Sequence, residues 1–383
     1  MTHQTPPGET ILTNARLVLP DSVIHGTLVM RDGRIAEVSD TRSHAPGALD
    51  CEGETLIPGV VDVHTDNLER QVQPRASARW PSRSAFLAHD AQCAAAGVTT
   101  VLDALCLGDL GFDQGRDQTF RDGVEDLTAL APTGLLKSEH LLHLRCELPA
   151  PDMPPLLDMV ADHPLVVMVS LMDHSPGVGQ YRDLARYRAM RMRQANLSPS
   201  EVEAKVNHLQ AQRARLRETQ RRYVLDRVGH RHLAIASHDD ESAEQVAENA
   251  RDGIRISEFP VTMEAAAAAR GLGVGVIAGA PNIVRGGSHS GNVAAEALVR
   301  EGAVDVLASD YVPPAMIEAA FRIADIVGLP AAIGTITLAA ARMSHLSDRG
   351  ALEAGLRADV VRVKLHDGLP VVRQVWRAGE RVI

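Results

Sequence analysis

The chain has 383 residues, 45% of them hydrophobic and 3% aromatic, a composition that predicts a large core of aliphatic side chains. Its formal net charge of −10 argues against nonspecific nucleic-acid binding, which depends on a basic surface. No stretch approaches the roughly 18 uninterrupted apolar residues of a membrane span, and residues 1–13 lack the features of a signal peptide. We therefore expect a globular cytoplasmic protein with no nucleic-acid or membrane partner.

Both ends of the chain have the pattern of strands without intervening helices. Residues 10–56 alternate short apolar runs with turns, among them Asp32-Gly33. The tail from Ala358 repeats this pattern around Asp367-Gly368. We predict a small β-sandwich domain formed from both termini, over residues 1–55 and 355–383.

Between these ends, apolar runs alternate with helical stretches, which is the pattern of a parallel sheet. We expect strands at 56–64, 99–105, 140–148, 165–172, 232–238, 255–259, 273–278 and 304–309. Eight such strands favour a closed (β/α)8 TIM-type barrel over residues 56–354. An open doubly wound sheet is the alternative, but no Gly-x-Gly-x-x-Gly segment follows an early strand.

The connection from about residue 175 to residue 230 is the one irregular part of this alternation. Its helical periodicity predicts an inserted helical hairpin, and arginines concentrate in it. Two interpretations stay open for these arginines. They form either a solvated helix face, interleaved with Glu and Gln, or a basic lid over a phosphate-bearing substrate.

Polar side chains end several of the predicted strands, where a barrel places its active site. The first strand ends with His64, and Asp66 projects to the same side because strand side chains alternate. Glu147 ends the third strand, His238 the fifth, and Asp310 follows the eighth. Each alone has an ordinary structural explanation, such as a helix cap or an ion pair. Together at one rim they predict a metal site, and histidine with carboxylate ligands suits Zn²⁺, or alternatively Mn²⁺ or Fe²⁺.

Several motifs resemble the amidohydrolase superfamily, whose members are barrels with a small β-domain. The resemblance rests on IPGVVDVHTDN after a strand-rich start, the late ASD and the closing GLRADVV. The blocks ASHDD, ISEFP and GAPNIVRGGSHSGN are more specific and resemble a diphosphatase family of phosphonate catabolism. This resemblance implies one or two divalent metal ions as cofactor and a small phosphorylated ribose as substrate. It leaves the oligomeric state open, a homo-oligomer included.

The sequence departs from the commonest superfamily pattern at three places. The first strand carries His64-x-Asp66 in place of His-x-His, no lysine ends the fourth strand, and Glu258 ends the sixth in place of a histidine. By resemblance and position, Glu147 would replace the usual bridging lysine. His174 and Glu258 are further candidate ligands, or else contacts to the substrate or to another ligand.

The resemblance also implies a mechanism. Water activated by the metal would attack the α-phosphorus of a ribose 5-triphosphate and release pyrophosphate. Asp310 is expected to accept the proton, and His238 is the second catalytic candidate. Cationic and polar side chains must meet the charge of the substrate, and the candidates for this role are Arg145, Arg182, Arg285, His289 and Asn67.

Two other functions stay open from the sequence. A C–N hydrolase, of the amidase or N-acetylsugar-phosphate deacetylase type, would use the same metal rim. A non-enzymatic scaffold would be expected to have lost its ligands, whereas all five of the residues predicted at the rim are present.

Overall fold

The computed structural model describes residues 8–75, 78–111, 115–195, 197–288 and 291–383. Its centre is an eight-stranded parallel sheet whose strands pair in chain order. They are β6 (Val60–Thr65), β7 (Val98–Leu107), β8 (Glu139–Glu147), β9 (Val166–Met172), β10 (Ala234–His238), β11 (Ile256–Glu258), β12 (Gly275–Gly279) and β13 (Val306–Ala308). A parallel bridge between Thr65 and Asp310 brings the end of the last strand to the first, and the Asp310 amide donates to the His64 carbonyl at 3.0 Å. The predicted (β/α)8 barrel with a small β-domain is confirmed.

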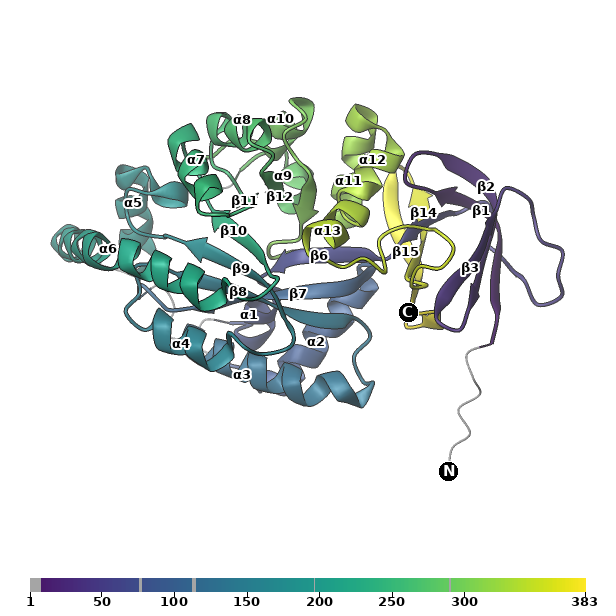
Figure 1. The fold of residues 1–383 in the computed structure, drawn as a ribbon, viewed down its shortest axis with the longest axis horizontal. Coiled ribbons are helices and arrows are strands. Elements are labelled where there is room, and N and C mark those ends of the chain that lie inside the picture. The colour runs from purple at the N-terminus through teal and green to yellow at the C-terminus, as the bar shows by residue number, and fades with distance from the viewer. Residues whose placement is uncertain (1–7, 76–77, 112–114, 196, 289–290) are drawn as a thin grey trace.

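Helices cover the outside of this barrel (Figure 1). Their bounds are α1 (Asn67–Val72), α2 (Ser82–Ala95), α3 (Arg116–Leu130), η1 (Ala131–Thr133), α4 (Met153–Val160), η2 (Gly179–Tyr181), α5 (Leu184–Ala195), α6 (Pro199–Val228), α7 (Ala243–Arg251), α8 (Met263–Gly271), α9 (Ala280–Arg285), α10 (Ala295–Arg300), α11 (Ala315–Val327), α12 (Leu329–Gly334) and α13 (Leu338–Met343). Aliphatic side chains fill the space between the sheet and these helices. Among the described residues, no helix is both long enough and apolar enough to cross a membrane.

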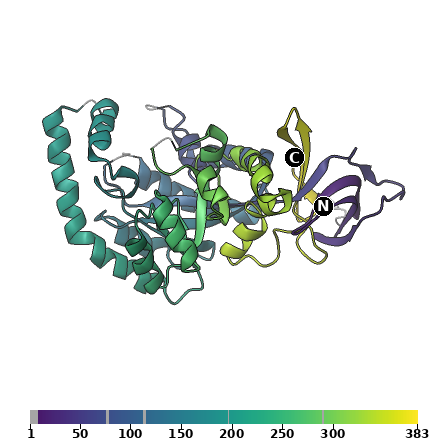
Figure 2. The ribbon, with the colours of Figure 1, turned by 90° about the horizontal axis from the view of Figure 1, so that it is seen from above.

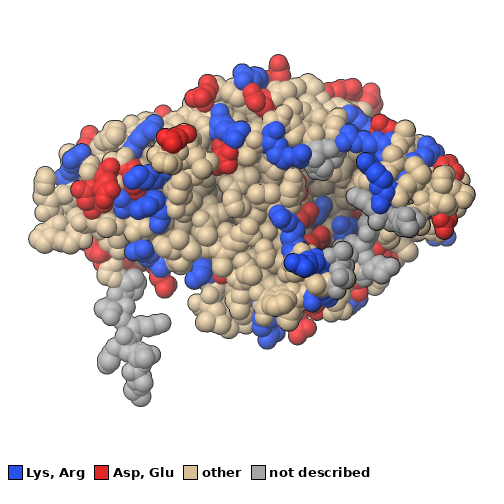
Figure 3. All heavy atoms as spheres, turned by 180° about the vertical axis from the view of Figure 1, so that it is seen from behind, with Lys and Arg blue, Asp and Glu red and all other residues tan. Residues whose placement is uncertain are grey.

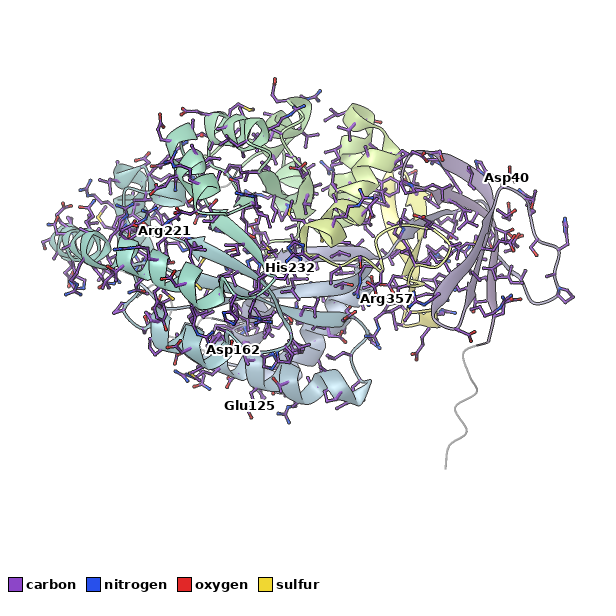
Figure 4. All side chains as sticks on the ribbon, viewed as in Figure 1. Asp40, Glu125, Asp162, Arg221, His232 and Arg357 are labelled. Atoms are coloured by element: carbon purple, nitrogen blue, oxygen red, sulfur yellow. The ribbon has the colours of Figure 1, made fainter. Side chains whose placement is uncertain are left out.

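Strands from both termini form one mixed sheet beside the barrel. It contains β1 (Thr10–Val18), β2 (Val23–Arg31), β3 (Arg34–Ser39), β4 (Leu49–Asp50), β5 (Thr55–Pro58), β14 (Val360–His366), β15 (Leu369–Arg377) and β16 (Glu380–Arg381). β5 lies between β1 of the N-terminal part and β14 of the C-terminal part. Arg357, labelled in Figure 4, links this sheet to the barrel, since it contacts Asp359 and donates to the hydroxyl of Thr100 at 3.1 Å.

The single strand predicted over residues 56–64 is wrong, because the chain changes sheets at Gly59. Residues before it belong to β5 of the terminal sheet, and residues after it belong to β6 of the barrel. A Cβ atom on Gly59 would lie 2.2 Å from the Thr99 hydroxyl oxygen, so only glycine fits this crossing. The apolar run continues through the crossing because both sheets bury it.

The segment between β9 and β10 contains α5 and α6, which Figure 2 shows at the end of the molecule farthest from the terminal sheet. α6 begins with a capping box, in which Ser198 and Glu201 each bind the other's backbone amide. Arginines of α6 form ion pairs with neighbouring elements: Arg213 with Asp173, Arg221 with Asp252, and Arg227 with Asp158 and Asp162. Arg221 and Asp162 are labelled in Figure 4. These arginines of α6 therefore attach the helix to the barrel.

Candidate metal centre

A cavity of about 300 Å³ lies at the carboxyl ends of the barrel strands. Its floor is formed by side chains that end four strands or follow directly after them: His64, Asp66, His174, His238, Asp239 and Asp310. Figure 3 shows acidic side chains inside a hollow with basic side chains around it, at the end of the molecule that carries α5 and α6. The cavity is where a (β/α)8 barrel places its active site.

Each histidine of this cavity donates a hydrogen bond from one ring nitrogen to a buried carboxylate. Glu258 accepts hydrogen bonds from Nδ1 of His64 and Nδ1 of His238, both at 2.7 Å. Glu147 accepts one from Nδ1 of His174 at 2.6 Å and a second from the His174 backbone amide at 2.9 Å. A histidine that donates Nδ1–H to a carboxylate has its Nε2 lone pair available for a metal ion. All three histidines therefore have the orientation that a metal-binding histidine needs.

The Nε2 atoms and nearby carboxylates fall into two groups whose donor atoms lie within 4.8 Å of one another: His64, Asp66 and Asp310 in the first, and His174, His238 and Asp239 in the second. In the first group, His64 Nε2 lies 3.6 Å from an oxygen of Asp66. In the second, Asp239 Oδ2 lies 3.7 Å from His174 Nε2 and 3.8 Å from His238 Nε2.

These distances are too long for hydrogen bonds but suit ligands of a common ion. Two ligands of a tetrahedral ion with bonds of about 2.1 Å lie about 3.4 Å apart. In addition, His64 Nε2 and Asp239 Oδ2 are buried and lack a hydrogen-bond partner among the described residues. Buried polar atoms are rarely left unpaired, so these two atoms fit positions that face a cation.

The backbone turns sharply where these side chains enter the cavity. Asp239, Phe259 and Asp310 each follow a barrel strand and have φ values of 58°, 53° and 55°, in the left-handed region that non-glycine residues seldom adopt. Each of their amides donates to the carbonyl of a neighbouring strand, for example Asp239 to Glu258 at 2.9 Å. Such strain commonly persists at functional sites, where the surrounding structure enforces it.

Several carboxylates lie close together on the floor of this cavity, and their pKa values differ. Burial and the neighbouring charge of Asp66 raise the pKa of Asp310 to about 7. Burial also opposes ionisation of Asp66, but the charge of Arg145 outweighs it and lowers the pKa of Asp66. Arg145 donates to Asp66 at 2.6 Å. A divalent cation bound by Asp66 and Asp310 would favour the ionised form of both carboxylates.

The residues predicted to bind the substrate do not all lie at the metal cavity. Arg145 and Arg285 line the metal cavity, Arg145 buried and Arg285 exposed. Arg182 is exposed and lines a neighbouring cavity. Asn67 lies away from both, since it is buried and its amide contacts His89 and Gln92 of α2. The predicted contact His289 lies outside the described residues.

Three acidic residues need separate mention. Glu147 and Glu258 end strands as expected, and their carboxylate oxygens accept hydrogen bonds from histidine nitrogens. Glu258 also forms, with His64 and His143, a further group of donor atoms within 4.8 Å of one another. The sequence prediction left out Asp239, which belongs to the group of His174 and His238. The segment ASHDD contains Asp239, but strand alternation directs residue 239 away from the side of His238, and only the left-handed turn brings it back.

Comparison with known proteins shows the family to which the chain belongs. No protein-family model matches the chain. Over 376 residues the chain is 40% identical to the alpha-D-ribose 1-methylphosphonate 5-triphosphate diphosphatase of Escherichia coli K12, an alignment that covers 97% of this chain and 100% of that relative.

Solved structures of amidohydrolases share the fold. N-acetyl-D-glucosamine-6-phosphate deacetylase from Mycobacterium smegmatis aligns with a TM-score of 0.61 and 16% identity, over 98% of this chain and 100% of that one. 5-Methylcytosine deaminase from Klebsiella pneumoniae aligns with a TM-score of 0.62 and 15% identity, over 98% and 97% of the two chains. Because the curated relative is 40% identical along almost the whole chain, the protein belongs to the family of alpha-D-ribose 1-methylphosphonate 5-triphosphate diphosphatases, hydrolases of the amidohydrolase superfamily.

Proposed function

We propose that the protein hydrolyses alpha-D-ribose 1-methylphosphonate 5-triphosphate to the 5-phosphate and pyrophosphate. The observation that carries the proposal is the set of three histidines that line one cavity, each with Nδ1 bound to a buried glutamate. This arrangement is typical of a metal-dependent hydrolase. The similarity to the E. coli diphosphatase supports the choice of substrate.

We assign one divalent ion to each group of ligands, His64 with Asp66 and Asp310, and His174 with His238 and Asp239. Imidazole and carboxylate donors without thiolate favour zinc, with manganese or iron as alternatives. When bound, such ions lower the pKa of a water molecule and neutralise charge on the phosphoryl oxygens. In this assignment Glu147 and Glu258 are positioning residues that orient the histidines, and the alternative assignment has Glu147 as a bridging ligand of the two ions.

The chain's own residues perform the proton transfer and the charge stabilisation. Water attacks the α-phosphorus, and the bond from that phosphorus to the bridging oxygen of the leaving pyrophosphate breaks. Asp310, on the cavity floor, accepts the water proton at its carboxylate. Arg145 stands beside Asp66, where its guanidinium can stabilise charge on the transferred phosphoryl group.

A ³¹P NMR assay of the zinc-loaded protein tests this function. We expect pyrophosphate and the ribose 5-phosphate to form together, in equal amounts. Release of orthophosphate, or an unchanged triphosphate, would exclude the proposed reaction. The competing C–N hydrolase is tested in parallel with N-acetylglucosamine 6-phosphate, from which release of the free amine would favour that alternative.

A further inference from the structure

A second cavity of about 470 Å³ adjoins the metal cavity. Gln180 and Asn292 line both, so the two cavities meet at these side chains. The second cavity lies between the η2 to α5 segment and the chain at Gly291 and Asn292. It therefore extends the metal cavity towards the helices inserted after β9.

Arginines dominate the charge of the second cavity. Arg182, Arg186 and Arg193 line it, and Asp183 is the acidic residue among its described lining residues. The Asp183 carboxylate accepts the Arg186 backbone amide at 3.0 Å, so it is engaged with the first turn of α5. The lining thus carries a net excess of positive charge beside a metal centre.

Neighbouring arginines of the same insertion behave differently. Arg188 of α5 forms a two-pronged ion pair with Glu203, at 2.8 and 3.1 Å. Arg213 and Arg221 of α6 bind Asp173 and Asp252. These residues do not line the second cavity. Arg186 and Arg193 of α5, which line the cavity, are thus a different set from these three arginines.

The backbone opposite α5 is shaped for close approach of a guanidinium. A Cβ atom on Gly291 would lie 2.3 Å from Nη1 of Arg186, and Gly291 has a φ of 78°, which favours glycine. Any larger residue there would push Arg186 out of its place. The Arg186 guanidinium therefore lies close to the backbone at Gly291, and both residues line the cavity.

We infer that the second cavity holds the β- and γ-phosphates of the triphosphate chain, the part that leaves as pyrophosphate. This inference rests on the proposed function. A terminal diphosphate carries about three negative charges and a phosphonate ester about one, so the more basic cavity suits the diphosphate end. The metal cavity, with the exposed Arg285 at its rim, accommodates the ribose and its phosphonate.

The test measures binding of inorganic pyrophosphate and of orthophosphate to the zinc-loaded protein by isothermal titration calorimetry. Arg182→Ala, Arg186→Ala and Arg193→Ala are compared with the matched control Arg188→Ala, which lies on α5 with Arg186 and Arg193 but outside the cavity. Each cavity variant should weaken pyrophosphate binding about fivefold, the usual effect of one partly exposed ionic contact, and the triple variant considerably more. The zinc content of the protein is measured before and after each titration, because pyrophosphate chelates metals.

Orthophosphate binding should stay within twofold of the parent in all four variants, and the control should leave pyrophosphate binding unchanged. The inference is overturned if the triple variant binds pyrophosphate like the parent, or if it loses affinity for both anions equally. Because binding is measured without turnover, this result is independent of the ³¹P assay. Failure of the proposed reaction and failure of the subsite are therefore distinguishable.

Discussion

Glu258 fixes the ring of His64 by a 2.7 Å hydrogen bond from Nδ1 to Oε1, while its other oxygen accepts Nδ1 of His238. One carboxylate thus sets the tautomer of a histidine in each of the two ligand groups. A glutamine in its place would offer one acceptor oxygen, so only one of the two rings could keep its hydrogen bond.

We expect Glu258→Gln to lower metal affinity by roughly 10- to 100-fold, the usual effect of removing a partner that orients a ligand. Competition with a chromogenic chelator measures this change. Glu296→Gln, at an exposed i,i+4 pair on α10, is the matched control and should bind metal like the parent. If Glu258→Gln bound metal as tightly as the parent, Glu258 would not be needed to orient the metal-binding histidines.

Removing a ligand should empty its subsite without unfolding the barrel, because the core is aliphatic and lies below the cavity. We expect His238→Ala to bind one equivalent of zinc where the parent binds two, and to keep a cooperative thermal transition. Elemental analysis and calorimetry measure the two properties. Two equivalents in the purified variant would refute the assignment of His238 as a ligand.

The proposed general base can be separated from substrate binding by kinetics. A group that accepts a proton in the transition state affects kcat more than KM. Asp310→Asn should lower kcat by roughly 10²-fold or more, the scale of general-base contributions. Because Asp310 is also an assigned ligand, the assay is run at saturating zinc with metal content measured. Parent-like kcat would mean that another group accepts the proton.

The barrel could be predicted from sequence because its strands are short, largely apolar segments that alternate with helical stretches. The crossing at Gly59 could not, because the residues on both sides of it are buried in one sheet or the other. An apolar pattern in the sequence indicates that residues are buried, but it does not indicate which of two sheets buries them. The change of sheet at Gly59 therefore leaves no signal in the pattern.

From the predicted strand ends we expected His64, Asp66, His238 and Asp310 at one rim of the barrel. In the structure all four side chains line one cavity. Sequence alone could not decide whether a buried glutamate such as Glu147 reaches a metal or a neighbouring histidine, since both lie on the same face of the barrel end.

A second buried network, between α2 and strands β7 and β8 and outside the metal cavity, predicts a pH dependence of stability. His140 donates from Nδ1 to Asp103 at 2.9 Å and from Nε2 to Asp90 at 3.2 Å. Burial opposes its protonation, but the charges of Asp103 and Asp90 outweigh burial and raise the pKa of His140 to about 9. His140 is therefore a buried cation between two carboxylates at neutral pH.

Because the folded-state pKa of His140 lies above the ordinary histidine value of about 6.5, its ionic contribution is fully present below pH 6.5 and is lost as the pH rises through 9. The pH-dependent contribution of His140 to the free energy of unfolding should be on the order of 3 kcal/mol.

Urea unfolding of the parent and of His140→Gln at pH 6 and pH 9.5 measures this contribution. The variant should be much less stable than the parent at pH 6, and the gap should narrow at pH 9.5. His208→Gln, at an exposed site on α6, should follow the parent at both pH values. An equal gap between His140→Gln and the parent at pH 6 and pH 9.5 would show that His140 is neutral in the folded protein.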